Sequence, residues 1–227
     1  MLVDSLESFK VFVESRLLER FGKVTSTGSG VVIDHDLVLT AAHVVDESEI
    51  QKVVIGKDIY RAKVLKRFSA SDVAILRVIS KKPLPFMKLG IPEAILLGDF
   101  NFTVGFPALE LFGTNPKFYR SYISGLEGAN GNPEMFQICA DACHGISGSA
   151  VFQLNGILNG LISEGYTGKT ESIHNFVFAT KIGPILKDIQ RYLSYKIEKS
   201  SNSDFRSDRK IFQKAIEASV IVLNCQK

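Results

Sequence analysis

Short apolar runs dominate the chain from residue 23 to about residue 178. They read GVVID, LVLTAA, KVVIG, VAILRV, FTVGF, YRSYISG, GSAVF and GLISEG, and each is bounded by Gly, Asp, Asn or Pro. Runs of this length, punctuated by turn-forming residues, are typical of β-strands. The pattern therefore predicts an all-β fold, with many antiparallel strands arranged in a sandwich or barrel.

Helical spacing replaces the strand pattern at both ends of the chain. Asp4 and Glu7 resemble a capping box, and apolar residues then recur every three or four positions until Gly22, which predicts an amphipathic helix over 1–22. After Gly183 and Pro184 the helical period returns, from Ile185 to Ile197. These features predict a central domain over 23–199 that ends in a helix.

The last part of the chain, 200–227, reads as a polar linker followed by a helix over 208–224. The linker is KSSNSDFRSD, and the apolar positions of the helix are Ile211, Phe212, Ala215, Ile216 and Val220. Two interpretations stay open. The helix docks a partner protein or a further domain, or it packs on the domain of its own chain.

Composition narrows the class of protein. The 227 residues are 45% hydrophobic, enough for one large domain or two small ones. A formal net charge of +3 with scattered Lys and Arg argues against nucleic acid and membrane-surface partners. Charged residues interrupt the opening segment, and three cysteines do not make a disulfide framework, so we expect a cytoplasmic protein.

The run DACHGISGSAVF places Ser147 among small residues, where it is either a nucleophile or only a hydroxyl in a tight turn. A nucleophilic serine needs a base and a carboxylate that orients the base. His43, at the end of an apolar strand, is the best candidate base among the four histidines, and Asp72 opens another apolar strand. The other histidines, His35, His144 and His174, are placed in polar turns or loops.

The order His43, Asp72, Ser147 resembles the chymotrypsin-fold serine peptidases. GSGVVIDHDLVLTAAHVV is similar to the histidine region of that family, SDVAILRV to its aspartate region and GISGSAVF to its serine region. The resemblance spans residues 23–195, and the short loops are closest to the HtrA-type and viral branches. It implies two packed six-strand barrels, the site in the crevice between them, and no cofactor.

The same resemblance assigns roles around the site. It implies an oxyanion hole formed by the N–H groups of Gly145 and Ser147, and a specificity pocket with Asp141 at its floor. Ser163 and Gly165 would line that pocket, and Asp141 would select Lys or Arg in a protein or peptide substrate. Val177, where open pockets carry glycine, would instead close the floor.

Three other interpretations compete with the serine peptidase. A metal site at Cys139, Cys143 and His144 lacks a second ligand pair at finger spacing, so no metal is expected. An α/β-hydrolase with Ser147, Glu164 and His174 lacks the Gly-x-Ser-x-Gly elbow. A protease-like binding or scaffold module without turnover is the remaining alternative, and the presence of all three triad residue types argues against it.

Overall fold

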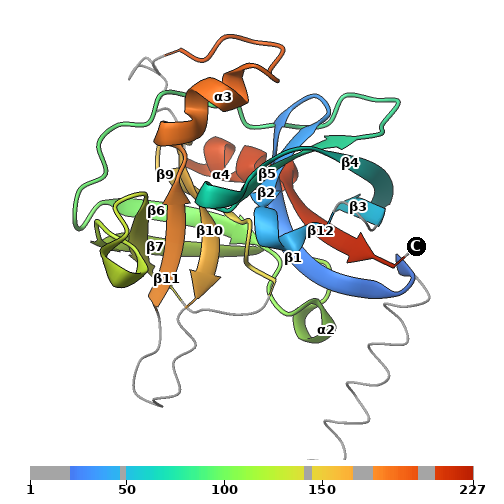
Figure 1. Cartoon of the computed structure of the whole chain (residues 1–227), viewed down its shortest axis with the longest axis horizontal. Helices are drawn as coiled ribbons and strands as arrows, with labels where there is room; N and C mark the ends of the chain where they lie inside the picture. The colour runs from blue at the N-terminus through green and yellow to red at the C-terminus, as the bar shows by residue number, and fades with distance from the viewer. Residues whose placement is uncertain (1–20, 47–49, 141–144, 166–175, 199–207, 227) are drawn as a thin grey trace, which may run out of the picture.

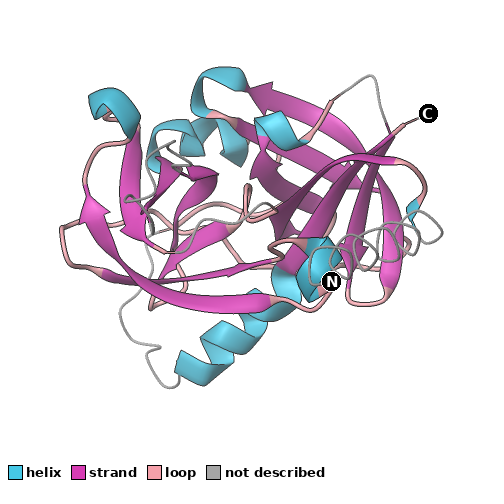
Figure 2. Cartoon of the chain, turned by 90° about the horizontal axis from the view of Figure 1, so that it is seen from below, coloured by secondary structure: helices cyan, strands magenta, loops and turns pink. Residues whose placement is uncertain are grey.

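The computed structural model describes residues 21–46, 50–140, 145–165, 176–198 and 208–226. Two closed antiparallel barrels of six strands each lie side by side (Figure 1). Strands make up most of the regular secondary structure in the described chain, and the helices are short and lie around them (Figure 2). The predicted all-β fold with two packed barrels is confirmed.

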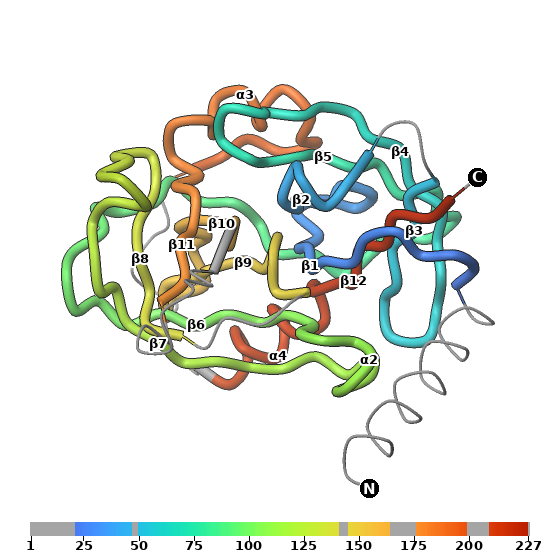
Figure 3. The backbone as a smooth tube through the Cα atoms, turned by 60° about the horizontal axis from the view of Figure 1, so that its bottom comes forward, coloured from blue at the N-terminus to red at the C-terminus, as the bar shows by residue number. Residues whose placement is uncertain are grey.

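The first barrel combines five strands from the first third of the chain with one from its end. Around the barrel the order is β1, β12, β3, β4, β5, β2. The bounds are β1 Val24–Asp34, β2 Leu37–Ala41, β3 Ile50–Ile55, β4 Asp58–Phe68, β5 Val73–Val78 and β12 Ser219–Cys225. Figure 3 shows the red end of the chain, β12, running beside the blue β1.

The second barrel has the order β10, β11, β8, β7, β6, β9. The bounds are β6 Phe100–Gly105, β7 Lys117–Gly125, β8 Met135–Cys139, β9 Ala150–Gln153, β10 Leu158–Gly165 and β11 Phe176–Lys181. Its interior holds a buried cluster that consists of Ile123, Phe136, Ile138, Ile146, Val151, Ile162, Val177 and Ala179. Alternation along each strand places these side chains inside the barrel.

Short helices connect the strands. The 3-10 helices are η1 Ala42–Val44, η2 Ser69–Ser71, η3 Ala129–Gly131 and η4 Gly183–Ile185. The α-helices are α2 Leu109–Phe112, α3 Leu186–Gln190 and α4 Asp208–Ala218. No helix in the described segments is long and apolar enough to cross a membrane.

The structure corrects two predictions at the C-terminal end. The helix expected after Pro184 is short, because α3 ends at Gln190 and turns follow it. The helix predicted over 208–224 holds only as far as Ala218, and 219–225 form the strand β12, in which every residue is buried. Its β-branched residues Val220, Ile221 and Val222 suit a strand that is paired on both edges.

Residues 219–225 are therefore a strand of the first barrel, and α4, which precedes them, packs on the domain of its own chain. Ala215 and Ala218 of α4 are fully buried in the main core cluster. Of the two interpretations of this segment, packing on the domain of its own chain is the one observed. The helix predicted over 1–22 lies almost wholly outside the described residues.

Candidate active site

His43 and Asp72 are brought together by the pairing of β2 with β5. Ala41 faces Val73 in that ladder, so the residues that follow β2 lie beside those that precede β5. The backbone N–H of Ala42 donates to the carbonyl of Asp72 at 3.0 Å. Two segments separated by almost thirty residues therefore meet at the edge of the first barrel.

Asp72 holds His43 through both carboxylate oxygens. Its Oδ2 lies 2.8 Å from His43 Nδ1, and its Oδ1 accepts the backbone N–H of His43 at 2.9 Å. The histidine side chain is half exposed, and the aspartate side chain is more enclosed, with 25% of its surface accessible. This arrangement fixes the ring orientation and leaves Nε2 as the ring nitrogen that is not used by Asp72.

The charged form of Asp72 is favoured where it lies. Burial raises the pKa of Asp72, but the hydrogen bonds from His43 and Ser163 and the charge of His43 outweigh burial, so the pKa is lowered from its ordinary value of 3.8. The residue is thus a carboxylate at neutral pH, as an acceptor for an imidazole N–H must be.

Ser163 joins Asp72 to Ser147. Its hydroxyl donates to Asp72 Oδ2, while its backbone carbonyl accepts the hydroxyl of Ser147 at 3.2 Å. The sequence predicted Ser163 as a wall of the specificity pocket, yet in the structure its hydroxyl is directed to the carboxylate. Ser163 therefore contacts both Asp72 and Ser147, two of the three predicted catalytic residues. The sequence did not indicate this placement.

Ser147 lies in a tight loop shaped by two glycines. Gly145 has a φ of 91° and Gly148 a φ of 83°, a backbone region that other residues rarely adopt. The N–H of Gly148 donates to the carbonyl of Ile162 at 2.6 Å, and the N–H of Ser149 donates to the carbonyl of Ile146 at 2.9 Å. The loop is thereby anchored to β10 and folded back on itself.

The amides of Gly145 and Ser147 are predicted to stabilise an oxyanion. Neither N–H has a hydrogen-bond acceptor among the residues that the structure describes. The two residues lie in one loop, with only Ile146 between them, and we call residues 145–148 the nucleophile loop after the predicted nucleophile Ser147. An oxyanion hole needs backbone donors that no protein acceptor occupies.

Ser29 is a second residue that the sequence analysis missed. It is completely buried, and its hydroxyl donates to the carbonyl of Gly145 at 2.7 Å and accepts the N–H of Phe106 at 2.9 Å. Its backbone N–H donates to the carbonyl of Ser147 at 2.8 Å. One serine of β1 thus contacts the nucleophile loop at both ends and the segment after β6.

The predicted specificity residues are only partly described. Asp141 lies outside the described residues, as do Cys143, His144 and His174. Gly165 ends β10 and faces Val177 of β11. The side chain of Val177 is fully buried within the second barrel.

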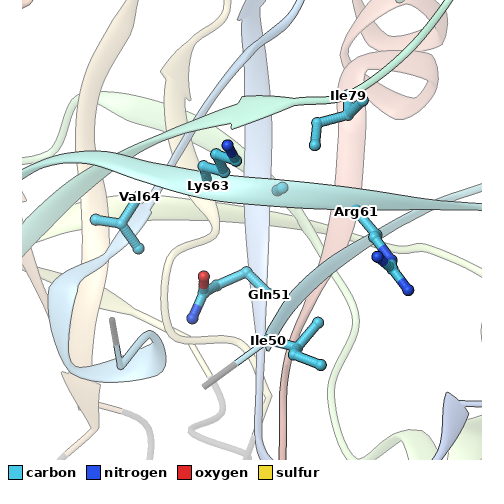
Figure 4. Close-up of a pocket in the computed structure, with 7 residues that line it drawn as sticks. Ile50, Gln51, Arg61, Lys63, Val64 and Ile79 are labelled. Carbon is cyan, nitrogen blue, oxygen red and sulfur yellow. The ribbon is translucent and has the colours of Figure 1, made fainter. Parts of the chain in front are cut away.

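A groove of about 410 Å³ lies on the first barrel, apart from the candidate active site. Figure 4 shows the side chains around it, which come from β3, β4 and the residue after β5; the lining residues are Ile50, Gln51, Arg61, Ala62, Lys63, Val64 and Ile79. The amide of Gln51 already donates to the Asp46 carbonyl and to Asn224. None of the three predicted catalytic side chains lines this groove.

The family model described as a trypsin-like peptidase domain matches residues 28–161. The chain belongs to this family. Residues 28–161 include His43, Asp72 and Ser147 and end within β10. The predicted resemblance to chymotrypsin-fold serine peptidases of HtrA type is confirmed by this match and by the following relatives.

Among curated relatives, the trypsin-like peptidase domain is similar to the periplasmic serine endoprotease DegP of Escherichia coli (strain K12). The two are 33% identical over 147 residues, which cover 61% of this chain and 30% of DegP. It is also similar to the mitochondrial serine protease HTRA2 of Bos taurus, with 37% identity over 84 residues, 36% of this chain and 18% of the relative. The match thus spans less than a third of either relative.

A serine endoprotease from Yersinia pestis has a similar fold. Its crystal structure aligns with a TM-score of 0.60 and 22% identity, covering 74% of this chain and 57% of that chain. The names of the DegP relatives contradict one prediction: they are periplasmic, so the expectation of a cytoplasmic location is wrong. Charge pattern and cysteine count, on which that expectation rested, do not determine the compartment of a domain of this family.

Proposed function

We propose that this trypsin-like peptidase domain is a serine endopeptidase that hydrolyses peptide bonds in protein substrates through an acyl-enzyme. The observation that carries the proposal is the hydrogen bond of 2.8 Å between Asp72 Oδ2 and His43 Nδ1, with Ser147 linked to the same carboxylate through Ser163. Membership of the family and similarity to proteins named serine endoproteases support it.

In the first half of the reaction, Ser147 Oγ attacks the carbonyl carbon of the scissile bond, and its proton passes to His43 Nε2. For this step the hydroxyl leaves the Ser163 carbonyl and donates to His43. Asp72 accepts the Nδ1–H of the ring and stabilises the imidazolium. The amides of Gly145 and Ser147 bind the oxyanion, and His43 then protonates the leaving amine as the C–N bond breaks.

In the second half, a water molecule attacks the acyl carbon. His43 takes a proton from that water, and Ser147 Oγ leaves and regains a proton from His43. The product acid departs, and the enzyme is restored. No step needs a metal or an organic cofactor, since every proton has a donor and an acceptor among Ser147, His43, water and the substrate.

A fluorophosphonate probe tests this proposal. We expect covalent labelling of the wild-type chain at neutral pH and none of Ser147→Ala, with both proteins folded by circular dichroism. We also expect the wild type, and not the variant, to cleave casein. A folded wild type that neither reacts nor cleaves would favour the alternative, a protease-like binding or scaffold module without turnover.

We also propose that cleavage follows Lys or Arg. Asp141 lies six residues before Ser147, and a carboxylate at the floor of the pocket would be left unpaired by an apolar side chain. Val177 is the observation against it, because the side chain is fully buried in the second barrel and a branched residue at this position would close the floor of the pocket. A peptide-library profile measures which residue precedes the cleaved bond. We expect Lys or Arg, with the preference lost in Asp141→Ser. A preference for small aliphatic residues would contradict the proposal.

A further inference from the structure

The helix α4 continues directly into the strand β12, and together the two elements contact both barrels. The strand fills a position between β1 and β3 in the first barrel, with all seven residues buried. The helix lies where the barrels meet, and contacts between β12 and β6 add to the junction. Figure 3 shows the red segment passing from the second barrel into the first.

On the second barrel, the contact of α4 is aromatic. The Phe212 ring packs against Phe102 at 4.7 Å and Phe118 at 5.0 Å between centroids, and the Arg120 guanidinium lies 5.2 Å from the same ring. Phe102 is fully buried, and it also stacks on Phe152. The Phe212 side chain therefore attaches the helix to β6 and β7 through directional contacts, and Phe102 continues the cluster to Phe152 of β9.

On the first barrel, the contact of β12 reaches the segment that carries His43. Asn224 is buried, and its Oδ1 accepts the N–H of Asp46 at 3.2 Å and the amide of Gln51 at 3.1 Å. Asp46 is the third residue after His43. The strand β12 therefore supports the loop between η1 and β3, as well as pairing with β1.

The same strand supports β1 at the point where β1 meets the nucleophile loop. Ser29, which donates to the Ser147 carbonyl, faces Ile221 in the ladder, and Gly28 faces Val222. A side chain at Gly28 would collide with Val44 beside His43. The pairing of β12 with β1 thus supports both halves of the proposed triad.

We propose that α4 and β12 form an inter-barrel clamp, in which Phe212 and Asn224 are positioning residues that set His43 relative to Ser147. This inference rests on the proposed function, because the position of His43 relative to Ser147 matters only if the two residues act together in catalysis. His43 and Asp72 belong to the first barrel and Ser147 to the second, so any shift of one barrel changes the distance over which the proton moves. A misplacement of about 1 Å costs on the order of 100-fold in rate.

The kinetic test compares Phe212→Ala and Asn224→Leu with wild type. We expect kcat per folded protein to fall by about 10- to 100-fold, while KM changes by less than about twofold, since the clamp does not line the substrate site. Phe212→Tyr keeps the aromatic ring, so we expect its kcat to stay near the wild-type value. Lys214→Ala, an exposed position on the same helix, is the matched control and keeps wild-type kinetics.

A second measurement does not depend on activity. Nitroxide labels are introduced as unnatural amino acids at the exposed positions Lys57 and Glu127, one on each barrel. Double electron–electron resonance spectroscopy then measures the distance between the two labels. The clamp predicts a narrow distribution in the wild type and in Lys214→Ala, and a broadened or shifted one in Phe212→Ala. A distribution in Phe212→Ala that matches the wild type overturns the clamp, whether or not the chain is an active peptidase. An inactive wild type with a broadened Phe212→Ala distribution would instead refute the proposed function and leave the clamp supported.

Discussion

The backbone N–H of Ser29 donates to the carbonyl of Ser147 at 2.8 Å, which joins the nucleophile loop of the second barrel to the first strand of the first barrel. The hydroxyl of the same serine donates to the Gly145 carbonyl. A peptidase of this fold divides its catalytic groups between two barrels. This buried serine is where the backbone of one barrel directly fixes the loop of the other.

Replacing Ser29 by alanine removes the hydroxyl partner of the Gly145 carbonyl and of the Phe106 N–H. Because both groups are buried beside the nucleophile loop, we expect a loss of about 1–3 kcal/mol in the free energy of unfolding. Release of the Gly145 carbonyl lets its peptide plane turn, so kcat falls on the order of tenfold or more. Urea unfolding and steady-state kinetics measure the two effects.

Ser26→Ala is the matched control for that substitution. Ser26 lies on the same strand, is partly exposed, and makes no side-chain hydrogen bond among the described residues. We expect stability and kcat to stay near wild type. Equal kinetics for Ser29→Ala and Ser26→Ala would mean that the hydroxyl of Ser29 has no part in orienting the loop.

Asp72→Asn should remove turnover while preserving the fold. The backbone of Asp72 is left-handed, with φ 49° and ψ 42°, a conformation that asparagine adopts readily, so the local chain is not disturbed. The amide presents an N–H to His43 and favours the wrong tautomer, and kcat falls by about 10⁴-fold. Circular dichroism shows the fold, and a peptide substrate shows the rate. Wild-type activity in the variant would exclude Asp72 from the mechanism.

Gly148→Ala tests the packing behind the nucleophile. A Cβ at this position would lie within 3.0 Å of the Ser29 carbonyl oxygen, the Thr40 hydroxyl and the Ala41 nitrogen. The collision adds to the cost of a φ of 83°, so we expect a loss of about 2–4 kcal/mol in stability, together with loss of fluorophosphonate labelling.

Gly98→Ala separates the two causes. Gly98 has a similar φ of 86°, but a Cβ there meets no atom within 4 Å. The backbone cost alone, about 1 kcal/mol, is therefore expected, with labelling unchanged. A Gly148→Ala chain as stable as Gly98→Ala would contradict the close approach of β1 and β2 to the loop.

The sequence alone was sufficient for the features that depend on local pattern. Alternating apolar runs predicted the strands. The strand-edge placement pointed to His43 and Asp72, which are hydrogen-bonded, and to Ser147, which is linked to Asp72 through Ser163. β12 was missed because its apolar residues follow the helical pattern of α4 without a break. Only the position between β1 and β3 gives Ile221 and Val222 a sheet partner on both sides.

The roles of Ser29 and Ser163 could not be predicted for a different reason. Their partners are a backbone carbonyl and a carboxylate that lie 116 and 91 residues away along the chain. A small buried hydroxyl carries no periodicity, and its partner is defined only once the barrels are packed. Single-sequence patterns predict which residues are buried better than they predict which distant polar group each one meets.

The buried carboxylate of Asp34 connects the segment after α3 to the first barrel by hydrogen bonds. It accepts the N–H and the hydroxyl of Ser194 and the N–H of His35. Burial raises the pKa of Asp34, but these hydrogen bonds and the charge of His35 outweigh it and lower the pKa below the ordinary 3.8. Folding therefore favours the ionised form, and the carboxylate stabilises the protein at neutral pH.

A lowered pKa gives stability that is fully present above the ordinary value and is lost as the pH falls through the lower value of the folded state. At pH 7 we expect Asp34→Asn to lower Tm by several degrees, at about 2–4 °C per kcal/mol for a chain of this size. As the pH falls below 3.8 the difference from wild type should shrink, because the wild type loses the contribution that the variant never had. Asp36→Asn, at a half-exposed neighbour paired with Arg77, should change Tm little at any pH. A difference between wild type and Asp34→Asn that stays constant down to pH 2.5 would show that the stabilisation comes from shape and neutral hydrogen bonds, and not from the charge.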